Sequence, residues 1–257
     1  MPDEVRTVLC DLDGVVWLAH DPIPGAVDAI ARLRASGRRV LFVTNNSAAL
    51  VADHEASLAA IGIEARGDVV SSSMAAASLL APGERVLVAG GPGIVEAVES
   101  AGAVAVVNDG TDLDDPVDAV VVGLHRDFDY DRLRVAGRAV LDGARLIGTN
   151  SDTTYPTPRG LEPGGGSIVA AIGAVGGVDA TFAGKPEQPM ADLVVRLVDP
   201  SPQSPRTSSM LMIGDRPETD GLFAERIGCG FALVETGVTA AGHGTHRDLA
   251  AVVDSLH

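Results

Sequence analysis

Short valine-rich segments alternate with helical patterns along almost the whole chain, and this alternation constrains the fold more than any other feature. Residues 6–13 and 38–46 are apolar enough to form buried strands, and residues 25–36 between them have apolar side chains at helical spacing. A second helix is expected at 50–61. Because strands separated by helices usually pair in parallel, the pattern predicts an α/β protein with helices on both faces of a parallel sheet.

The alternation restarts near residue 84 and again after Ala183, so one α/β unit could be inserted into another. Periodicity alone does not establish such an insertion. Further strands are predicted around 84–91, 103–109, 118–124, 145–150, 209–215 and 229–236. Further helices are predicted around 95–101 and 133–141, after the glycine-rich turn at 164–167, and at 190–198 and 223–227.

Composition excludes several classes of protein. The formal net charge is −16 and aromatic residues make up only 3% of the chain, which argues against a nucleic-acid partner. We expect no membrane partner, because no apolar run approaches the roughly 18 residues of a membrane span. The two cysteines and the absence of a secretory signal favour a cytoplasmic protein.

The motif VLCDLDGVVW places Asp11 and Asp13 at the end of an apolar strand. Residues two apart in an extended backbone face the same side, so both carboxylates should project from the carboxyl end of the strand. Open α/β sheets bind their ligands at that end. A divalent cation would remove the repulsion between the two charges. The alternative is a solvated turn without chemical function.

Two later strand ends also have polar groups. Thr44 and Asn45 follow the second strand, where a hydroxyl and backbone N–H groups could cradle phosphate oxygens or could begin a helix. Asp215 follows the strand SMLMIGD and could complete an oxygen-ligand metal site. Asp220, five residues later, could bond a metal-bound water or cap a helix.

Lys185 is the only lysine among the 19 basic residues. It is not a Walker A lysine, because Pro186 stands where that motif has Ser or Thr. A single lysine is most often a surface charge. This chain uses arginine for its other cations, which favours a position for Lys185 where a compact point charge is needed.

In their order, these four signals resemble the haloacid dehalogenase-like phosphatase superfamily. GTNSDTTYPTPRGLEPGGGSI and AGKPEQPM are similar to its subfamily IIA, which includes NagD-like nucleotide phosphatases, 4-nitrophenylphosphatases, and phosphoglycolate and glycerol-phosphate phosphatases. The resemblance covers nearly the whole chain. It implies a doubly wound, Rossmann-like parallel-sheet core at 1–82 and 184–257, and an inserted α/β type-two cap at 83–183 that determines substrate specificity.

The resemblance also implies a mechanism. Asp11 would attack phosphorus and form an aspartyl-phosphate, while Asp13 would protonate the leaving alkoxide and then activate water. Mg²⁺ would be bound by Asp11, the backbone carbonyl of Asp13 and Asp215, with Asp220 just outside these ligands. The phosphoryl group would be held by Thr44, Asn45 and Lys185.

The cap would supply the substrate contacts, for which the candidates are His125, Arg126, Asn150, Asp152 and Gly165. Relatives more often have an acid at the position of His125, so the leaving-group specificity does not transfer simply. We expect a small phosphorylated metabolite as substrate, with glycerol 3-phosphate ahead of phosphoglycolate or a nucleoside monophosphate. Any homodimer is expected to form through the cap.

Two other interpretations remain at this point. A receiver-like phosphoacceptor signalling module also places acids, a Thr or Ser and a lysine at parallel strand ends. The second aspartate of the first motif, the inserted unit and the late Gly-Asp favour the phosphatase. An inactive, structural relative is disfavoured by the complete set of acids.

Overall fold

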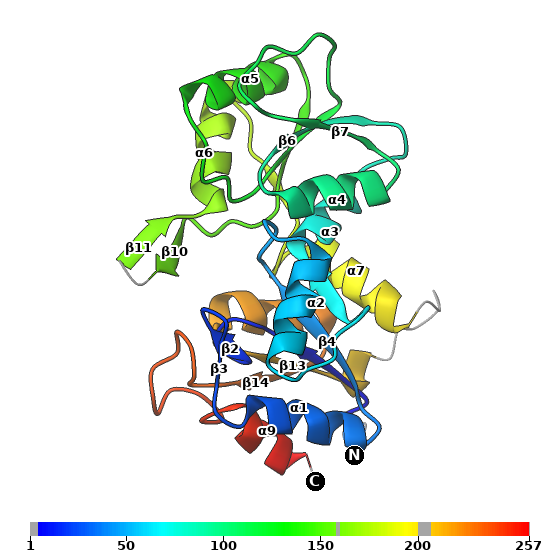
Figure 1. Cartoon of the computed structure of the whole chain (residues 1–257), viewed down its shortest axis with the longest axis vertical. Helices are drawn as coiled ribbons and strands as arrows, with labels where there is room; N and C mark the ends of the chain where they lie inside the picture. Colours follow the sequence, from blue (N-terminus) through cyan, green and yellow to red (C-terminus); the bar gives the residue numbers. More distant parts are fainter. Residues whose placement is uncertain (1–4, 158–159, 200–206, 257) are drawn as a thin grey trace. The chain divides into compact units, whose positions relative to one another are not determined.

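The computed structural model describes residues 5–157, 160–199 and 207–256. The chain folds into two compact α/β units (Figure 1). Unit 1 contains Met1–Thr44, Val51–Val70 and Lys185–His257. Unit 2 contains Asn45–Leu50 and Ser71–Gly184. The α/β class therefore agrees with the alternation in the sequence.

The centre of unit 1 is a five-stranded sheet in the order β14-β13-β1-β4-β5. Strand β1 pairs in parallel with both β4 and β13, so that Cys10 lies between Phe42 and Ile213. The chain first extends the sheet on one side of β1 and later returns to its other side, which creates a topological switch point between β1 and β13. The strands are β1 (Thr7–Cys10), β4 (Arg39–Thr44), β5 (Val69–Ser71), β13 (Met210–Gly214) and β14 (Gly230–Leu233).

Helices bury apolar side chains on both faces of this sheet. Helices α1 (Ala26–Ala35) and α9 (Leu249–Ser255) pack together (Figure 1) and place Ile30 and Val252 in one core with Val8, Cys10 and Phe42 of the sheet. The alternate strand residues, such as Leu9 and Leu41, are equally buried. The remaining elements of the unit are α2 (Val51–Ala60), α7 (Gln188–Val198), α8 (Leu222–Ile227), the two-stranded ribbon β2 (Trp17–Leu18) and β3 (Asp21–Pro22), the 3₁₀ turn Thr207–Ser209 and the π turn Pro217–Gly221.

Unit 2 has its own five-stranded sheet in the order β12-β9-β8-β6-β7, with parallel pairing throughout. Helices α5 (Tyr130–Leu141) and α6 (Gly165–Gly176) pack together and bury Val135 and Ile172 against it. The other elements are α3 (Ser72–Ala77), β6 (Arg85–Ala89), α4 (Pro92–Ser100), β7 (Val104–Val107), β8 (Ala119–Val122), β9 (Arg145–Gly148), the hairpin β10 (Thr154–Thr157) and β11 (Gly160–Pro163), and β12 (Thr181–Phe182).

Each strand and helix predicted from the sequence is present within a few residues. The division of the chain differs in detail from the expected one. Residues 71–82 and 45–50 group with unit 2, whereas the expected cap began at residue 83. None of the described helices is long and apolar enough to cross a lipid bilayer.

Candidate active site

Asp11 and Asp215 lie at the ends of β1 and β13, the two strands on either side of the switch point. The backbone N–H of Asp11 donates to the carbonyl of Ile213 at 2.9 Å, so the two strands remain paired as β1 ends. Both aspartates are buried, with exposed fractions of 9% and 1%. The carboxyl edge of the parallel sheet therefore carries two acids that are shielded from water.

Lys185 reaches this edge from the segment that precedes α7. Its side chain is 3% exposed. Its Nζ donates to Oδ1 of Asp11 and to Oδ1 of Asp220, both at 2.7 Å. The single lysine of the chain is thus a buried cation shared between two carboxylates, and it is not the surface charge that would be the default interpretation.

Asp220 is fully buried and both of its oxygens accept hydrogen bonds. Oδ1 accepts the bond from Lys185, and Oδ2 accepts a hydrogen bond from the backbone N–H of Arg216 at 3.2 Å. The π turn Pro217–Gly221 brings Asp220 against Gly214, where an added Cβ would lie 2.3 Å from the Asp220 side chain. The glycine of the Gly-Asp motif is therefore needed for the Asp220 carboxylate to reach Lys185.

Asp215 is held by a loop that the sequence analysis did not identify, residues 236–239 after β14. Oδ2 of Asp215 accepts the backbone N–H of Val238 at 2.6 Å, and Thr239 Oγ1 donates to the Asp215 carbonyl at 2.6 Å. Gly237 must be small, because an added Cβ would lie 2.0 Å from Oδ2 of Asp215. The position of this loop could have been predicted, because it follows a strand and therefore lies at the carboxyl edge of the sheet, where ligands bind.

The three buried acids fit a divalent cation. One carboxylate oxygen from each of Asp11, Asp215 and Asp220 lies within 4.8 Å of the others. Oδ1 of Asp215 is buried and has no hydrogen-bond partner among the described residues. Buried polar atoms are rarely left unpaired without a missing ion or water. Three carboxylates and one ammonium leave two uncompensated negative charges, which one divalent cation neutralises, and Mg²⁺ prefers oxygen ligands of this kind.

The pKa values reflect this crowding of charge. Burial raises the pKa of Asp11 to about 8, because desolvation outweighs the attraction of Lys185 and because Asp220 adds repulsion. Burial also raises the pKa of Asp215, although the Val238 N–H opposes the shift. Burial disfavours the charge of Lys185, but Asp11 and Asp220 stabilise it and raise its pKa. The lysine therefore remains protonated in the site.

The structure corrects the expected geometry of Asp13. Strand β1 ends at Cys10, so Asp11 and Asp13 do not both stand in an extended strand. Asp13 lies in the turn that follows and is exposed, whereas Asp11 is buried. Oδ1 of Asp13 accepts a hydrogen bond from Nε1 of Trp17 at 3.1 Å. Trp17 is a contact of the predicted acid–base residue that the sequence analysis missed.

Thr44 is 2% exposed and ends β4, the strand beside β1, so it lies at the same sheet edge as Asp11. Asn45 belongs to unit 2. Its backbone carbonyl accepts hydrogen bonds from Ser72 Oγ at 2.7 Å and from Asn150 Nδ2 at 2.9 Å. Asn150 thus has a structural contact within unit 2 that the sequence did not indicate.

The other cap candidates lie in the loops of unit 2. His125 is half-buried, and burial and Arg132 lower its pKa. The guanidinium of Arg126 lies over the ring of Tyr155, 5.5 Å from its centroid.

The glycine-rich turn before α6 allows close packing of backbones. A Cβ on Gly165 would lie 3.0 Å from the backbone of residues 123–124, and one on Gly166 would lie 2.4 Å from the carbonyl oxygen of Ser151. The backbone carbonyl of Asp152 accepts the N–H of Gly166 at 2.9 Å. These contacts explain the glycines by packing and leave the predicted substrate contacts of Asp152 and Gly165 untested.

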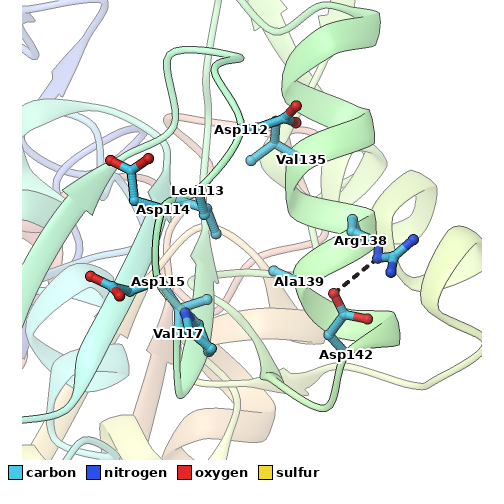
Figure 2. Close-up of a pocket in the computed structure, with 10 residues that line it drawn as sticks. Asp112, Leu113, Asp114, Asp115, Val117, Val135, Arg138, Ala139 and Asp142 are labelled. Carbon is cyan, nitrogen blue, oxygen red and sulfur yellow. Dashed lines mark hydrogen bonds and ion pairs between the residues drawn. The ribbon is translucent and has the colours of Figure 1, made fainter.

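A cavity of about 430 Å³ in unit 2 lies between residues 112–117 and helix α5 (Figure 2). None of the predicted site residues lines it. Its acids are largely neutralised by arginines: Arg138 contacts Asp142 at 2.9 Å, as drawn in Figure 2, and Arg134 contacts Asp112. Its lining has no lysine, and the acids paired with arginines there are exposed, unlike the buried carboxylates around Lys185.

Sequence comparisons give a consistent set of relatives. The sequence model of the family described as haloacid dehalogenase-like hydrolase matches residues 8–104, and a second, HAD-hydrolase-like model matches 182–257. The D-glycerol 3-phosphate phosphatase of Mycobacterium tuberculosis is 37% identical over 239 residues, which are 91% of this chain and 64% of that protein. The chain therefore spans less than two thirds of that relative. The acid sugar phosphatase of Staphylococcus saprophyticus is 34% identical over 91% of this chain and 88% of its own length.

Solved structures agree with this grouping. A glycerol phosphate phosphatase from Mycobacterium tuberculosis in complex with magnesium has a TM-score of 0.81 and 37% identity, over 91% of this chain and 69% of that one. A p-nitrophenyl phosphatase from Archaeoglobus fulgidus has a TM-score of 0.87 and 26% identity, over 98% and 99% of the two chains.

Proposed function

The chain belongs to the haloacid dehalogenase-like hydrolase family, and on that basis we propose that it is a Mg²⁺-dependent phosphatase of small phosphate monoesters that acts through an aspartyl-phosphate on Asp11. The phosphatase activity follows from the relatives, which are phosphatases by name. The preferred substrate is glycerol 3-phosphate.

One observation carries this proposal: a buried lysine joins Asp11 and Asp220 beside an Asp215 oxygen that has no partner among the described residues. A buried ammonium next to the nucleophile attracts the phosphoryl dianion and limits the repulsion between it and the Asp11 carboxylate. Burial strengthens this interaction relative to the same charges in water.

Each residue of the site then has a function in two successive displacements. Asp11 attacks phosphorus, and the leaving alkoxide takes a proton from Asp13. Asp13 next removes a proton from the water that hydrolyses the aspartyl-phosphate. Thr44 and the backbone N–H of Asn45 bind phosphoryl oxygens, and Lys185 neutralises them.

The cation would be held by Asp11, by the backbone carbonyl of Asp13 and by Asp215, whose Oδ1 supplies an available oxygen. When bound, Mg²⁺ neutralises the excess charge of the carboxylates and polarises a phosphoryl oxygen. Asp220 supports the site from outside these ligands, since both of its oxygens are already hydrogen-bonded.

Two observations support a short, non-aromatic substrate. The named function of the mycobacterial relative is the hydrolysis of D-glycerol 3-phosphate. Aromatic residues, on which a nucleobase could stack, make up only 3% of the chain, and Arg126 already lies over one face of the Tyr155 ring. The staphylococcal relatives favour sugar phosphates as the second candidate class. We assign substrate selection to unit 2 as the cap, and we place the protein in the cytoplasm because both cysteines are free thiols.

A panel of phosphate esters tests the proposal. Glycerol 3-phosphate, phosphoglycolate, sugar phosphates, a nucleoside monophosphate and 4-nitrophenyl phosphate are assayed with Mg²⁺ and with EDTA. We expect repeated turnover with Mg²⁺, loss of turnover in EDTA and the highest kcat/KM for glycerol 3-phosphate. A single phosphorylation event without turnover would instead indicate a receiver-like module. Equal activity with and without Mg²⁺ would contradict the metal site.

A further inference from the structure

A buried side chain at the start of β2 donates a hydrogen bond to an exposed one in the turn after β1. Trp17 is 1% exposed, whereas Asp13 is exposed. Nε1 of Trp17 lies 3.1 Å from Oδ1 of Asp13. Buried tryptophans usually find a partner for this N–H. Here the partner is the carboxylate that the mechanism uses for both proton transfers.

The position of the indole is fixed by the backbone and by the core. Gly14 N donates to the carbonyl of Trp17 at 2.8 Å, and Trp17 N donates to the carbonyl of Leu12 at 3.2 Å. The Trp17 side chain belongs to the same apolar core as Phe42 and Ile30. The N–H donor therefore cannot follow Asp13 if that carboxylate rotates.

The chemistry of the donor determines which carboxyl oxygen is available. An indole N–H can donate a hydrogen bond but cannot accept one, so Oδ1 of Asp13 must act as the acceptor in this pair. The carbonyl oxygen of a protonated carboxyl group is a better acceptor than its hydroxyl oxygen, so this contact favours Oδ2 as the oxygen that carries the proton. Among the described residues, Oδ2 has no hydrogen-bond partner and is free to face a substrate.

We propose that Trp17 is a positioning residue that holds Oδ1 of Asp13 and thereby directs Oδ2 to the leaving group and then to the hydrolytic water. The inference rests on the proposed phosphatase function. Without Trp17 Nε1, an exposed carboxylate on a turn samples several rotamers, and only a fraction of them can deliver the proton. The competing explanation is that Trp17 serves only to fill the core.

Two variants separate these explanations. Trp17→Phe keeps an aromatic ring in the core and removes the donor. The control, His20→Ala, removes the ring that lies 5.0 Å from Trp17 but keeps the indole N–H. The readout is kcat/KM, which covers the steps through transfer of phosphate to Asp11. It is measured for glycerol 3-phosphate, a poor leaving group, and for 4-nitrophenyl phosphate, whose leaving group needs little protonation.

Trp17→Phe should lower kcat/KM for glycerol 3-phosphate by about tenfold or more, and for 4-nitrophenyl phosphate by less than about threefold, because general acid catalysis is worth roughly 10²–10⁴. His20→Ala should leave both values near those of the wild type. In an Asp13→Ala background, Trp17→Phe should have no further effect. Equal losses on both substrates, or equal losses in the two single variants, would show a packing function and overturn the proposal.

A spectroscopic measurement covers the case in which Trp17→Phe does not fold. Trp17 is the only tryptophan of the chain, so the tryptophan emission reports on the surroundings of this one side chain. Asp13→Ala changes an exposed residue and should alter the Trp17 emission in the absence of substrate. The control is Asp21→Ala, because Asp21 is also exposed and lies in the ribbon that contains Trp17; this variant should leave the emission unchanged. An unchanged emission spectrum in Asp13→Ala would refute the contact. Wild-type protein inactive on all esters would instead refute the proposed function.

Discussion

Nζ of Lys185 lies 2.7 Å from Oδ1 of Asp11, and both side chains are buried. The two residues are 174 positions apart in the chain. Since the same Nζ also binds Asp220, one ammonium holds two carboxylates at the carboxyl edge of the sheet. This arrangement makes the site dependent on a compact cation at one position and on a second cation from solution.

Lys185→Arg should lower kcat by at least about a hundredfold although it preserves the charge, because a planar guanidinium cannot place one nitrogen against both carboxylates in a buried site. Steady-state kinetics with Mg²⁺ checks this. The matched control is Arg32→Lys at the exposed ion pair with Asp254, which should keep wild-type turnover. Substantial activity in Lys185→Arg would show that only the charge matters.

Gly214→Ala should destabilise the protein by about 1–3 kcal/mol and also abolish most activity. Its Cβ would lie 2.3 Å from the Asp220 side chain and would displace the carboxylate that holds Lys185. Thermal unfolding and kinetics measure the two effects. Gly230→Ala in the neighbouring strand is the control, because its Cβ would lie 3.2 Å from a side-chain atom of Leu211, which can move. Wild-type stability in Gly214→Ala would contradict the packing described for Asp220.

Mg²⁺ should raise the Tm more at about pH 8 than at about pH 5.5. In the metal-free protein, burial raises the pKa of Asp11 to about 8 and raises that of Asp215. Between the usual carboxyl pKa and about 8, the folded metal-free state therefore binds more protons than the unfolded chain, and its stability falls as the pH rises. Bound Mg²⁺ relieves this repulsion.

Differential scanning calorimetry with and without Mg²⁺ at the two pH values measures this difference. The difference between the Tm values with and without Mg²⁺ cancels the contribution of titrating groups elsewhere in the chain. Asp215→Asn should show a smaller Mg²⁺ response at both pH values. A response that decreases from pH 5.5 to pH 8 would be incompatible with a site built from ionised Asp11 and Asp215.

Asn150→Ala should lower the stability by about 1 kcal/mol and leave the ranking of substrates unchanged, because Asn150 Nδ2 binds the Asn45 carbonyl. Ser72 Oγ binds the same carbonyl, which limits the loss. Thermal unfolding and the ester panel are the measurements. Ser167→Ala removes an exposed hydrogen bond to the Thr153 carbonyl and should have a smaller effect. An altered substrate ranking in Asn150→Ala would instead support the predicted contact between Asn150 and the substrate.

The sequence predicted the elements around Asp11 and Asp215 because local patterns determine them. Valine-rich strands and the glycines that end α1 and α2 are readable from neighbouring residues. The antiparallel hairpin β10–β11 and the short helix α3 were not predicted, since neither has a sustained periodicity. The assignment of residues 71–82 to unit 2 depends on contacts distant in sequence, which no local pattern contains.

The resemblance to known phosphatases named four residues that the structure brings together, Asp11, Lys185, Asp215 and Asp220, but it could not give their surroundings. The Trp17 contact to Asp13 depends on the turn that follows β1, and the bonds from residues 236–239 to Asp215 come partly from backbone groups. Backbone donors have no sequence signature. From its position near a helix start, Asp220 could bond a metal-bound water or cap the helix. Only the structure shows that its two oxygens accept hydrogen bonds from Lys185 and from the backbone N–H of Arg216.

The most direct test asks whether Asp11 becomes phosphorylated. Asp13→Asn protein is mixed with 4-nitrophenyl phosphate and Mg²⁺, quenched in acid and mapped by mass spectrometry. We expect a phosphoryl group on the peptide that contains Asp11, because hydrolysis of the intermediate is slowed, and no such group in the Asp11→Asn/Asp13→Asn double variant. Wild-type turnover in Asp11→Asn, or a phosphoryl group on another residue, would contradict this expectation.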